Sequence, residues 1–443
     1  MDRRDLLALS GALAAAALAG CTGGGDGPSD TDDPDGTPTD GGASTETPPS
    51  GDPAVDDERL AALASGNAEF ALDLAQYLAT EQGGNQFFSP YSISVALAMT
   101  YAGARGETAT QMAETLHYTL GEEVHPAFAD LRTALQARET TEDPVEGDEV
   151  DAFQLSVANA LWGQEGYPFA EDYLSLVEKH YGAGLREADF AGDAEGERER
   201  INDWVAEQTE DRIEDLLPPG SLSPATVLVL TNAIYFMASW QFEFDPADTE
   251  DGTFTALDGT ESTVPMMHQN LRTNYASVPG AEAVELPYVG EDVSMVLILP
   301  EDFEDFERSL DADRLFGIFE QLHDARGDLA MPKFEYETEL RLSSVLSDLG
   351  MPVAFGSEAD FSGMVEGEGS DLQIDDVYHE AFVSVDEQGT EAAASTAVVM
   401  LESAPPEWGE LRFDRPFLFC VRDRPTDAVL FLGRVVDAGQ AQG

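Results

Sequence analysis

Apolar residues recur at near-helical spacing in the first well-patterned part of the chain, between residues 60 and 78. This spacing predicts an amphipathic helix. The acidic run Asp56-Asp57-Glu58 precedes it and favours the positive end of a helix. The same pattern predicts further helices over residues 91–103, 168–181 and 195–217.

Strand-like segments gather in the second half of the chain. Apolar runs rich in Val and Ile span residues 226–237, 293–299 and 428–436, and residues 413–421 have a similar composition. Such runs are typical of buried strands. Helices early and strands late, without regular alternation, predict an α+β fold rather than a doubly wound sheet. The stretch 139–151 is acidic and contains a proline and a glycine, so we expect a surface loop there.

The first 21 residues have the layout of an export signal. Arg3 and Arg4 open the chain, and the apolar run that follows is too short to cross a membrane as a helix. The paired arginines fit a twin-arginine signal. The sequence Leu18-Ala19-Gly20-Cys21 is similar to the lipobox of secreted lipoproteins, whose cysteine carries the lipid and becomes the first mature residue. We expect lipidation at Cys21; an ordinary cleaved signal with an incidental cysteine is the alternative.

Residues 22–55 consist mostly of Gly, Asp, Thr, Pro and Ser and contain no Lys, Arg or aromatic residue. Such a composition cannot compensate the entropy lost on ordering, so we predict a flexible tether. The globular pattern begins at Asp56. The sequence thus predicts a signal peptide over 1–21, a tether over 22–55 and one domain over 56–438.

Acidic residues outnumber basic ones along the whole chain. The 87 Asp and Glu against 22 Lys and Arg give a formal charge of −65, while 42% hydrophobic residues still allow a sizeable core. Such a surface repels phosphates, which excludes a sequence-independent nucleic-acid binder. The like charges also repel one another unless salt screens them, so the composition favours adaptation to a very salty medium. An acidic face for a basic partner is the alternative.

A search for catalytic motifs finds little. The chain has no G-x-S-x-G elbow, no P-loop and no dinucleotide-binding fingerprint. His379-Glu380 begins like a zinc helix, but Val383 stands where the second histidine would be. The two cysteines, Cys21 and Cys420, lie in unlike contexts, so a disulfide is not expected, and Cys420 fits a buried small hydrophobe on a strand. We therefore expect no enzyme activity, no metal and no cofactor.

One segment of small residues near the C-terminus stands out. It runs Glu387-Gln388-Gly389-Thr390-Glu391-Ala392-Ala393-Ala394-Ser395-Thr396-Ala397, before the apolar stretch 398–401 and Pro405-Pro406. Alanine is the best helix former, so a helix is one interpretation. The glycine at its head, the β-branched residues at its end and the strand-like segment that follows favour another. Side chains this small suit an exposed loop that can also slip between two strands.

Several short motifs follow one another in order along the chain. They are Asn85-Gln86-Phe87-Phe88-Ser89-Pro90-Tyr91-Ser92-Ile93, Tyr101-Ala102-Gly103-Ala104, Asn159-Ala160-Leu161-Trp162, Thr231-Asn232-Ala233-Ile234-Tyr235-Phe236 with Trp240 and Phe244, Met331-Pro332-Lys333-Phe334, Leu349-Gly350-Met351, Asp360-Phe361-Ser362-Gly363-Met364 and Asp414-Arg415-Pro416-Phe417. Taken together, from about residue 56 to 436, the chain resembles the serpins, a family of serine protease inhibitors. The resemblance implies N-terminal helices, a large central mixed β-sheet, smaller β-sheets and an exposed reactive-centre loop. With the export signal and the acidic composition, it suggests the secreted lipoprotein form of a haloarchaeon.

The resemblance implies an irreversible suicide inhibitor. A serine protease attacks a bait bond in the exposed loop and forms an acyl-enzyme, and the cut loop then inserts into the central sheet as a new strand. The residues that match the hinge of this loop are Glu387, Gly389, Thr390, Glu391, Ala392, Ala393, Ala394, Ser395 and Thr396. Alternate residues of an inserting strand must face the core, and Thr390, Ala392, Ala394 and Thr396 are small and uncharged, while Glu391 would face outward. This favours an inhibitory member of the family.

The family's usual spacing, counted from Glu387, places the bait bond between Ser403 and Ala404. A shift in register would select Leu401 or Glu402 instead. A small residue before the bond suits elastase-like or subtilisin-like proteases, and Leu401 would suit chymotrypsin-like or subtilisin-like ones. The loop contains no Lys or Arg, so trypsin-like enzymes are poor candidates.

The resemblance also implies where the sheet opens. Ser89, Ser92, Asn232 and His379 match the shutter, where the sheet must part, and Trp240 matches the breach, where the loop first enters. None of them would be catalytic, and His379 also fits a hydrogen-bonded buried histidine.

The partners expected from this interpretation are a secreted or cell-surface serine protease and a lipid anchor through Cys21 on the extracellular face of the membrane. We expect a monomer and no nucleic acid. The alternative within the fold is a non-inhibitory serpin that acts as a binding or chaperone-like cell-surface lipoprotein. A solute-binding lipoprotein of another fold is the alternative outside it.

Overall fold

The computed structural model describes residues 57–142, 149–151, 153–182, 184–367, 372–390 and 406–442 of the chain. The chain divides after Ala54, and every described residue belongs to the compact unit that follows. The expected signal peptide and tether, 1–21 and 22–55, lie outside the described residues, and so does Cys21.

The early helices follow the pattern seen in the sequence. α1 (Asp57–Glu81) begins on two acidic residues and buries the apolar positions predicted for one face. α2 (Pro90–Tyr101) is capped by Ser89, whose hydroxyl accepts a hydrogen bond from the Ser92 N–H at 3.0 Å. The remaining helices are α3 (Gly106–Thr115), α4 (Val124–Gln136), α5 (Glu171–Tyr181), α6 (Phe190–Gln208), α7 (Phe303–Arg308), α8 (Ala312–Gln321) and α9 (Ser343–Leu349).

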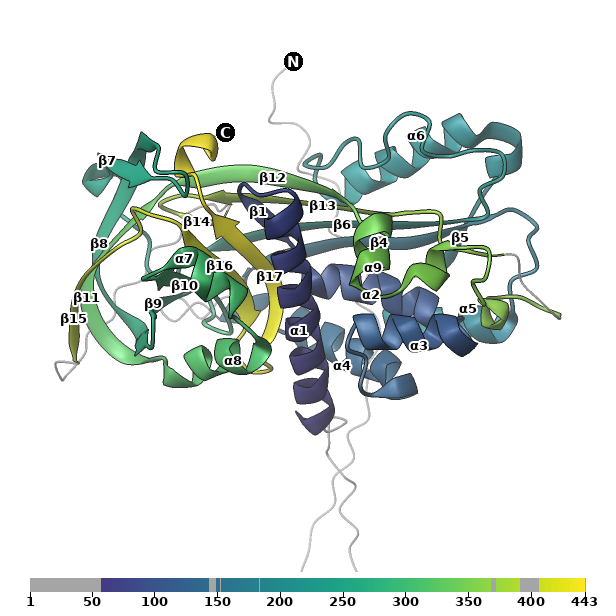
Figure 1. The fold of residues 1–443 in the computed structure, drawn as a ribbon, viewed down its shortest axis with the longest axis horizontal. Coiled ribbons are helices and arrows are strands. Elements are labelled where there is room, and N and C mark those ends of the chain that lie inside the picture. The colour runs from purple at the N-terminus through teal and green to yellow at the C-terminus, as the bar shows by residue number, and fades with distance from the viewer. Residues whose placement is uncertain are drawn as a thin grey trace, which may run out of the picture. The chain divides into compact units, whose positions relative to one another are not determined.

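A mixed sheet in the order β12-β13-β14-β6-β4-β5 forms one layer of the fold. Its strands are β4 (Gln154–Gln164), β5 (Leu185–Ala188), β6 (Leu228–Ser239), β12 (Phe334–Arg341), β13 (Val377–Val385) and β14 (Gly389–Thr390). Figure 1 shows α6 on one face of this sheet and the helices α2, α4 and α9 on the other. Residues of the sheet that face α2 are therefore buried under helices.

The larger sheet has the order β1-β17-β16-β10-β9-β8-β11-β15, and β7 pairs with β8. Its strands are β1 (Gln86–Phe88), β7 (Glu250–Thr255), β8 (Glu261–Val278), β9 (Ala281–Pro287), β10 (Val293–Pro300), β11 (His323–Pro332), β15 (Glu407–Arg412), β16 (Phe417–Asp423) and β17 (Ala428–Val435). β15 runs parallel to β11 at the edge of the sheet. The architecture is the α+β fold with a large mixed sheet that the sequence predicted.

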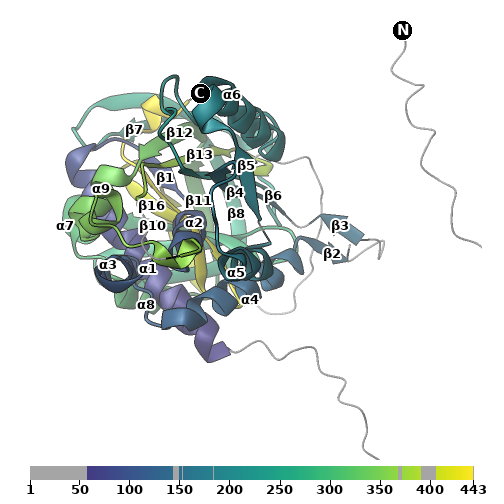
Figure 2. The ribbon, with the colours of Figure 1, turned by 90° about the vertical axis from the view of Figure 1, so that its right-hand side faces the viewer.

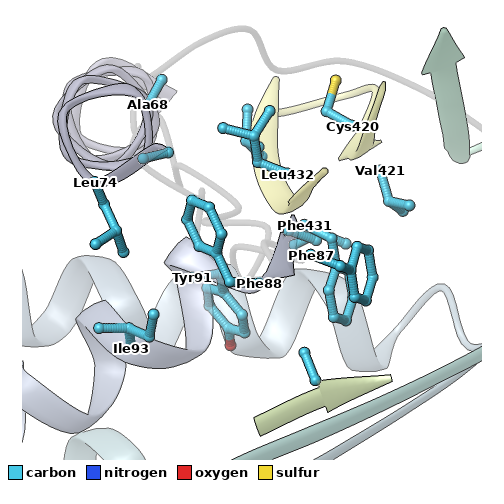
Figure 3. Packing of buried hydrophobic residues seen from close by; sticks show 14 of the residues in the cluster. Ala68, Leu74, Phe87, Phe88, Tyr91, Ile93, Cys420, Val421, Phe431 and Leu432 are labelled. Atoms are coloured by element: carbon cyan, nitrogen blue, oxygen red, sulfur yellow. The ribbon is translucent and has the colours of Figure 1, made fainter. Parts of the chain in front are cut away.

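The core lies where α1, α2 and the strands β1, β16 and β17 meet, as Figure 3 shows. The rings of Phe87 and Phe431 stack there with centroids 5.0 Å apart. Cys420 is buried on β16 in the same hydrophobic core, and burial raises the pKa of its thiol to about 12. The expectation of a buried small hydrophobe on a strand is confirmed at this position.

The strand predictions at 226–237, 293–299 and 428–436 are confirmed by β6, β10 and β17. The helix predicted over 195–217 was wrong only at its C-terminal end: α6 spans Phe190–Gln208, and a non-helical Asp193 separates its first turn from the regular helix that begins close to the predicted start. It stops because Glu210 and Asp211 adopt positive φ, a left-handed backbone that cannot continue a helix.

Two other expectations need correction. The segment 413–421 is not one strand: β15 ends at Arg412 and β16 begins at Phe417, with Pro416 between them. Proline lacks the N–H that a ladder requires, so the chain changes sheet neighbours there. The expected loop 139–151 contains paired strands at both ends, β2 (Thr140–Glu142) and β3 (Glu149–Asp151).

Candidate functional site

The mixed sheet is parted at one end by the start of the loop segment. β14 lies between β13 and β6: Thr390 pairs with Val385 of β13 and with Ala238 of β6. Farther along, from Val377 to Ala381, β13 pairs directly and in parallel with β6. The hinge residues Gly389 and Thr390 therefore already occupy the gap that a longer inserted strand would widen.

Thr390 sits in a pocket of aromatic side chains at this end of the sheet. It is 2% exposed, and its hydroxyl lies 2.8 Å from the Tyr288 hydroxyl. The Tyr288 ring stacks on the Trp240 ring at a centroid distance of 4.7 Å. The Trp240 indole N–H in turn donates to the Asp386 carbonyl at 3.0 Å. Trp240, predicted at the breach, thus lies against the first residues of the loop segment.

Gly389 is required by the close approach of two backbones. Its φ is +156°, and a Cβ added there would lie 2.1 Å from the carbonyl oxygen of Ala238. Any other residue would have to push β6 away. The turn before it is closed by Asp386, whose carboxylate accepts from the Gln388 N–H at 2.8 Å.

Glu387 is held by charge as well as by position. Its carboxylate lies 2.6 Å from the Lys333 ammonium and accepts from the Thr249 hydroxyl at 2.7 Å. Burial opposes ionisation, but the hydrogen bonds from Lys333 and Thr249 outweigh it and lower the pKa of Glu387. The hinge is therefore anchored by one of only two lysines in the chain.

A second cluster joins β13 and β6 where they pair directly. His379 of β13 and Asn232 of β6 are register partners, and the His379 Nδ1 is hydrogen-bonded to the Asn232 side-chain oxygen. The Asn232 amide donates to the Ser92 hydroxyl at 2.7 Å. Ser89 lies beside them and donates its hydroxyl to the Leu430 carbonyl at 2.7 Å. The structure thus brings together all four residues predicted at the shutter.

The hydrogen bonds determine the tautomer of His379. The Ser89 backbone N–H can only donate, so the His379 Nε2 at 3.2 Å must accept and Nδ1 must carry the proton. The ring is 1% exposed, and burial lowers its pKa to about 3. His379 is therefore neutral at ordinary pH, and protonation of Nε2 would break the contact with Ser89.

The cluster resembles a serine–histidine pair in composition only. The Ser89 hydroxyl already donates to a carbonyl, and neither Nε2 nor Nδ1 of His379 is free to accept a proton from it. All of these side chains are fully buried, with no room for a substrate. These hydrogen bonds hold the two strands together, and the arrangement does not activate a nucleophile.

Two residues of this region were missed by the sequence analysis. Asn159 of β4 faces Asn232 in the register and accepts a hydrogen bond from the Ser92 hydroxyl at 3.1 Å. It belongs to the motif Asn159-Ala160-Leu161-Trp162, which was the only signal in the sequence, because its place opposite Asn232 depends on the strand register. Tyr288 had no signal, because its contacts with Trp240 and Thr390 come from segments far apart in the sequence.

The remaining candidates lie outside the described residues. They are the hinge residues Glu391, Ala392, Ala393, Ala394, Ser395 and Thr396, the bait-bond residues Ser403 and Ala404 with the alternatives Leu401 and Glu402, and the lipidation residue Cys21. Across the part of the chain that is described, no group of three or more His, Cys, Asp or Glu side chains could hold a metal ion. Within the same residues, no helix is both long and apolar enough to span a membrane.

The family model described as serpin (serine protease inhibitor) matches residues 65–438. An uncharacterised serpin-like protein of Thermococcus kodakarensis is 42% identical over 374 residues, covering 83% of this chain and 84% of its own. The leukocyte elastase inhibitor of Sus scrofa is 37% identical over 385 residues, covering 84% and 98%. The chain therefore belongs to the serpin family.

Solved structures agree on the fold. Uncleaved ovalbumin matches with a TM-score of 0.73 and 29% identity, covering 85% of this chain and all of its own. Thyroxine-binding globulin in complex with thyroxine matches with a TM-score of 0.72 and 30% identity, covering 85% and 99%. The family model is one of serine protease inhibitors, which are not themselves proteases.

Proposed function

We propose that this chain is an irreversible inhibitor of serine proteases that traps its target by inserting its cleaved loop into the mixed sheet. The observation that carries the proposal is the position of β14. Thr390 already pairs with both β13 and β6, Gly389 pairs with β6, and the two strands pair with each other only beyond β14. Insertion would extend an existing strand rather than begin a new one.

The register of β14 defines where the following residues would go. Continued along both neighbours, it brings Ala392 between Phe236 and Val383, Ala394 between Ile234 and Ala381, and Thr396 between Asn232 and His379. The neighbours of the first two positions are buried, so only small side chains would fit. Thr396 would meet the shutter, where its hydroxyl could replace the bond between His379 and Asn232.

The gain in strand pairing supplies a driving force. Opening β13 from β6 breaks one ladder, and an inserted strand forms two, one on each side. Each additional backbone hydrogen bond contributes on the order of 1 kcal/mol. Twelve inserted residues at roughly 3.3 Å each would carry an attached protease about 40 Å.

The chemistry of trapping belongs to the protease. Its serine oxygen attacks the carbonyl carbon of Ser403, the amine of Ala404 leaves with a proton, and the ester to Ser403 remains. The fragment that begins at Ala404 is released from the covalent complex. Leu401 and Glu402 are the alternatives for the residue that carries the ester. Small or apolar residues here favour elastase-, subtilisin- or chymotrypsin-like targets.

Location follows from the N-terminus of the sequence. Export through the paired arginines and lipidation at Cys21 would tether the inhibitor to the outer face of the cell membrane. The tether of 22–55 would give it a reach of roughly 30 Å. The inhibitor would act there as a monomer on secreted or surface proteases, in a salty medium.

The test mixes the purified protein with a subtilisin-like protease, an elastase-like protease and trypsin. We expect a band at the summed mass that survives boiling in detergent with the first two, and mass spectrometry of the released fragment identifies the bait bond. Trypsin should form no such band, since residues 391–405 contain no Lys or Arg. Cleavage within the loop by several proteases without any such band would refute the inhibitor.

That last outcome would favour the second candidate, a non-inhibitory serpin that acts in binding at the cell surface. One structural neighbour is thyroxine-binding globulin with thyroxine bound, so the fold accommodates a carrier role in that protein. The uncharged, seated Thr390 favours the inhibitor, because a binding protein has no need of a hinge that fits between two strands.

A further inference from the structure

A cavity of about 350 Å³ lies between α2, α4, the end of α5, the strands β4 and β5 and the C-terminal half of α6, away from the loop hinge. Figure 2 shows α4 and α5 side by side next to β4 and β5. The volume of the cavity falls in the range of small-molecule binding sites. Its lining combines aromatic rings with two arginines, Arg132 of α4 and Arg186 of β5.

Arg132 has no charged partner. Among the described residues its guanidinium donates no hydrogen bond and forms no ion pair, and its Nε is buried without a partner. Gly182 makes room for it, since a Cβ there would lie 1.9 Å from the Arg132 Nη1. A buried donor with no acceptor costs free energy unless a bound molecule supplies one.

A second donor without a hydrogen-bond partner among the described residues lines the same cavity. Tyr91 is 4% exposed, and its hydroxyl makes no hydrogen bond within the described part of the chain. Figure 3 shows this hydroxyl at the end of the ring away from Phe88. Burial raises the pKa of Tyr91 to about 12, and the nearby charge of Arg132 opposes that rise. Tyr91 is therefore a neutral donor close to Arg132.

Arg186 adds a second positive charge at the mouth of the cavity. It is exposed and stacks over Trp204, with its guanidinium carbon 4.4 Å from the ring centroid. It forms no ion pair among the described residues, and the stacking leaves its N–H edges free for a planar anion.

Two arginines without an ion pair in one cavity differ from most other described arginines of this acidic chain. The chain has 87 acidic residues to 22 basic ones, and most described arginines pair with a carboxylate. The acid in this cavity, Glu139, forms no ion pair with an arginine among the described residues, and burial raises its pKa. Asn159 in the wall is committed to the shutter through Ser92 and Asn232.

We propose that this cavity binds a small organic anion, separately from any action on proteases. Its carboxylate or phosphate group would accept hydrogen bonds from Arg132, Arg186 and the Tyr91 hydroxyl, and its apolar body would lie against Trp204. The arginine fork suits both head groups, so the experiment compares them.

The test is calorimetric titration of the whole protein with benzoate, phenyl phosphate and uncharged benzamide. The potassium chloride concentration is the lowest at which far-UV circular dichroism shows a folded chain. We expect at least one anion to bind in the micromolar to low millimolar range and benzamide to bind at least tenfold more weakly. The preferred anion identifies the head group. A tenfold higher salt concentration should weaken the binding of the anion and leave the binding of benzamide unchanged.

Two variants and a matched control locate the site. Arg132→Gln and Arg186→Gln should each weaken anion binding at least tenfold. Arg308 is an exposed arginine on α7, and Arg308→Gln should leave anion binding unchanged. Arg186 is exposed, so its variant remains informative if Arg132→Gln does not fold. Equal binding of benzamide, no binding of either anion up to ten millimolar, or unchanged binding by the Arg186 variant would overturn the proposal.

Discussion

Thr390 shows how much can depend on one small side chain. Its neighbours are Tyr288 and the strands β13 and β6, and no carboxylate of the described residues is hydrogen-bonded to its side chain. In Thr390→Arg, seating the hinge would bury an unpaired charge at a cost of several kcal/mol. We expect this variant to be cleaved by the target protease with at least a hundredfold loss of the trapped complex.

The matched control is Gln388→Arg, which places the same charge two residues away on an exposed side chain. It should trap the protease at close to the unmodified yield. The ratio of complex to cleaved inhibitor on a denaturing gel gives both answers. Equal yields from the two variants would mean that insertion does not pass through the position of Thr390.

His379 makes the stability of the folded chain depend on pH. Its pKa is lowered to about 3 in the folded chain, so below its ordinary value of 6.5 only the unfolded chain takes up the proton. This histidine therefore contributes full stability above pH 6.5 and loses it as the pH falls towards 3. At pH 5 the loss is about 2 kcal/mol.

Comparison with His379→Gln isolates this effect. Glu380 works in the opposite direction, because burial and the charges of Glu339, Glu337 and Asp215 raise its pKa to about 7. Urea unfolding at pH 7.5 and pH 5 should show a gap between the two proteins that narrows by about 2 kcal/mol at the lower pH. A gap of constant size would contradict the neutral buried imidazole.

At the scale of single residues, the sequence placed the shutter side chains and Trp240 only through the family resemblance. The physical pattern alone marked His379 as one of six scattered histidines. Tyr288 and Arg132 could not be singled out at all. Their roles depend on distances between elements far apart in the chain, and no local periodicity encodes these.

At the scale of elements, direct pairing of β13 with β6 keeps these two strands together. The ion pair between Lys333 and Glu387 holds the turn before β14 at the end of the sheet where the two strands are apart. Lys333 is the last residue before β12, and Glu387 lies in the turn that leads to β14. In Lys333→Gln the nearly buried Glu387 carboxylate would lose its counter-charge. Because the lysine is 35% exposed, we expect a modest loss of about 1–2 kcal/mol.

The chain supplies its own control, since Lys179 on α5 is the only other lysine. Lys179→Gln makes the same chemical change at an exposed position and should leave the unfolding free energy within about 0.5 kcal/mol of the original. Urea unfolding of both variants measures the difference. Equal effects would show that the lysines act only through net charge.

Element types followed from hydrophobic periodicity more readily than their ends did. α1 and β6 were anticipated because each keeps one pattern over many residues. The end of α6 was not, because it is set by positive φ at Glu210 and Asp211, and acidic residues are too common here to mark a helix end. β14, at two residues, was too short for any pattern to reveal.

For the whole molecule, the order of the motifs predicted the family and the order of helical and strand-like segments predicted the α+β fold, whereas composition alone predicted neither. The cavity beside Arg132 was invisible in the sequence. Its walls come from α2, α4, α5, α6 and two strands, and an unpaired arginine is defined by the acids that are absent around it. Such a site emerges only when the elements are assembled.

The net charge of −65 leads to a prediction for the whole chain. Most acids have no basic partner available, so their mutual repulsion opposes the compact state. The screening length falls from about 10 Å at 0.1 M salt to about 3 Å at 1 M, which removes most repulsion between neighbouring surface charges. The melting temperature should therefore rise steeply with potassium chloride up to about 1 M and more slowly above it. Thermal melts in potassium chloride, sodium chloride and tetramethylammonium chloride at matched ionic strength separate screening from specific ion binding. Screening predicts coinciding curves for the three salts up to about 1 M. A melting temperature that is flat or falls over this range would mean that the acids are compensated within the fold, and the case for salt adaptation would then lose its physical basis.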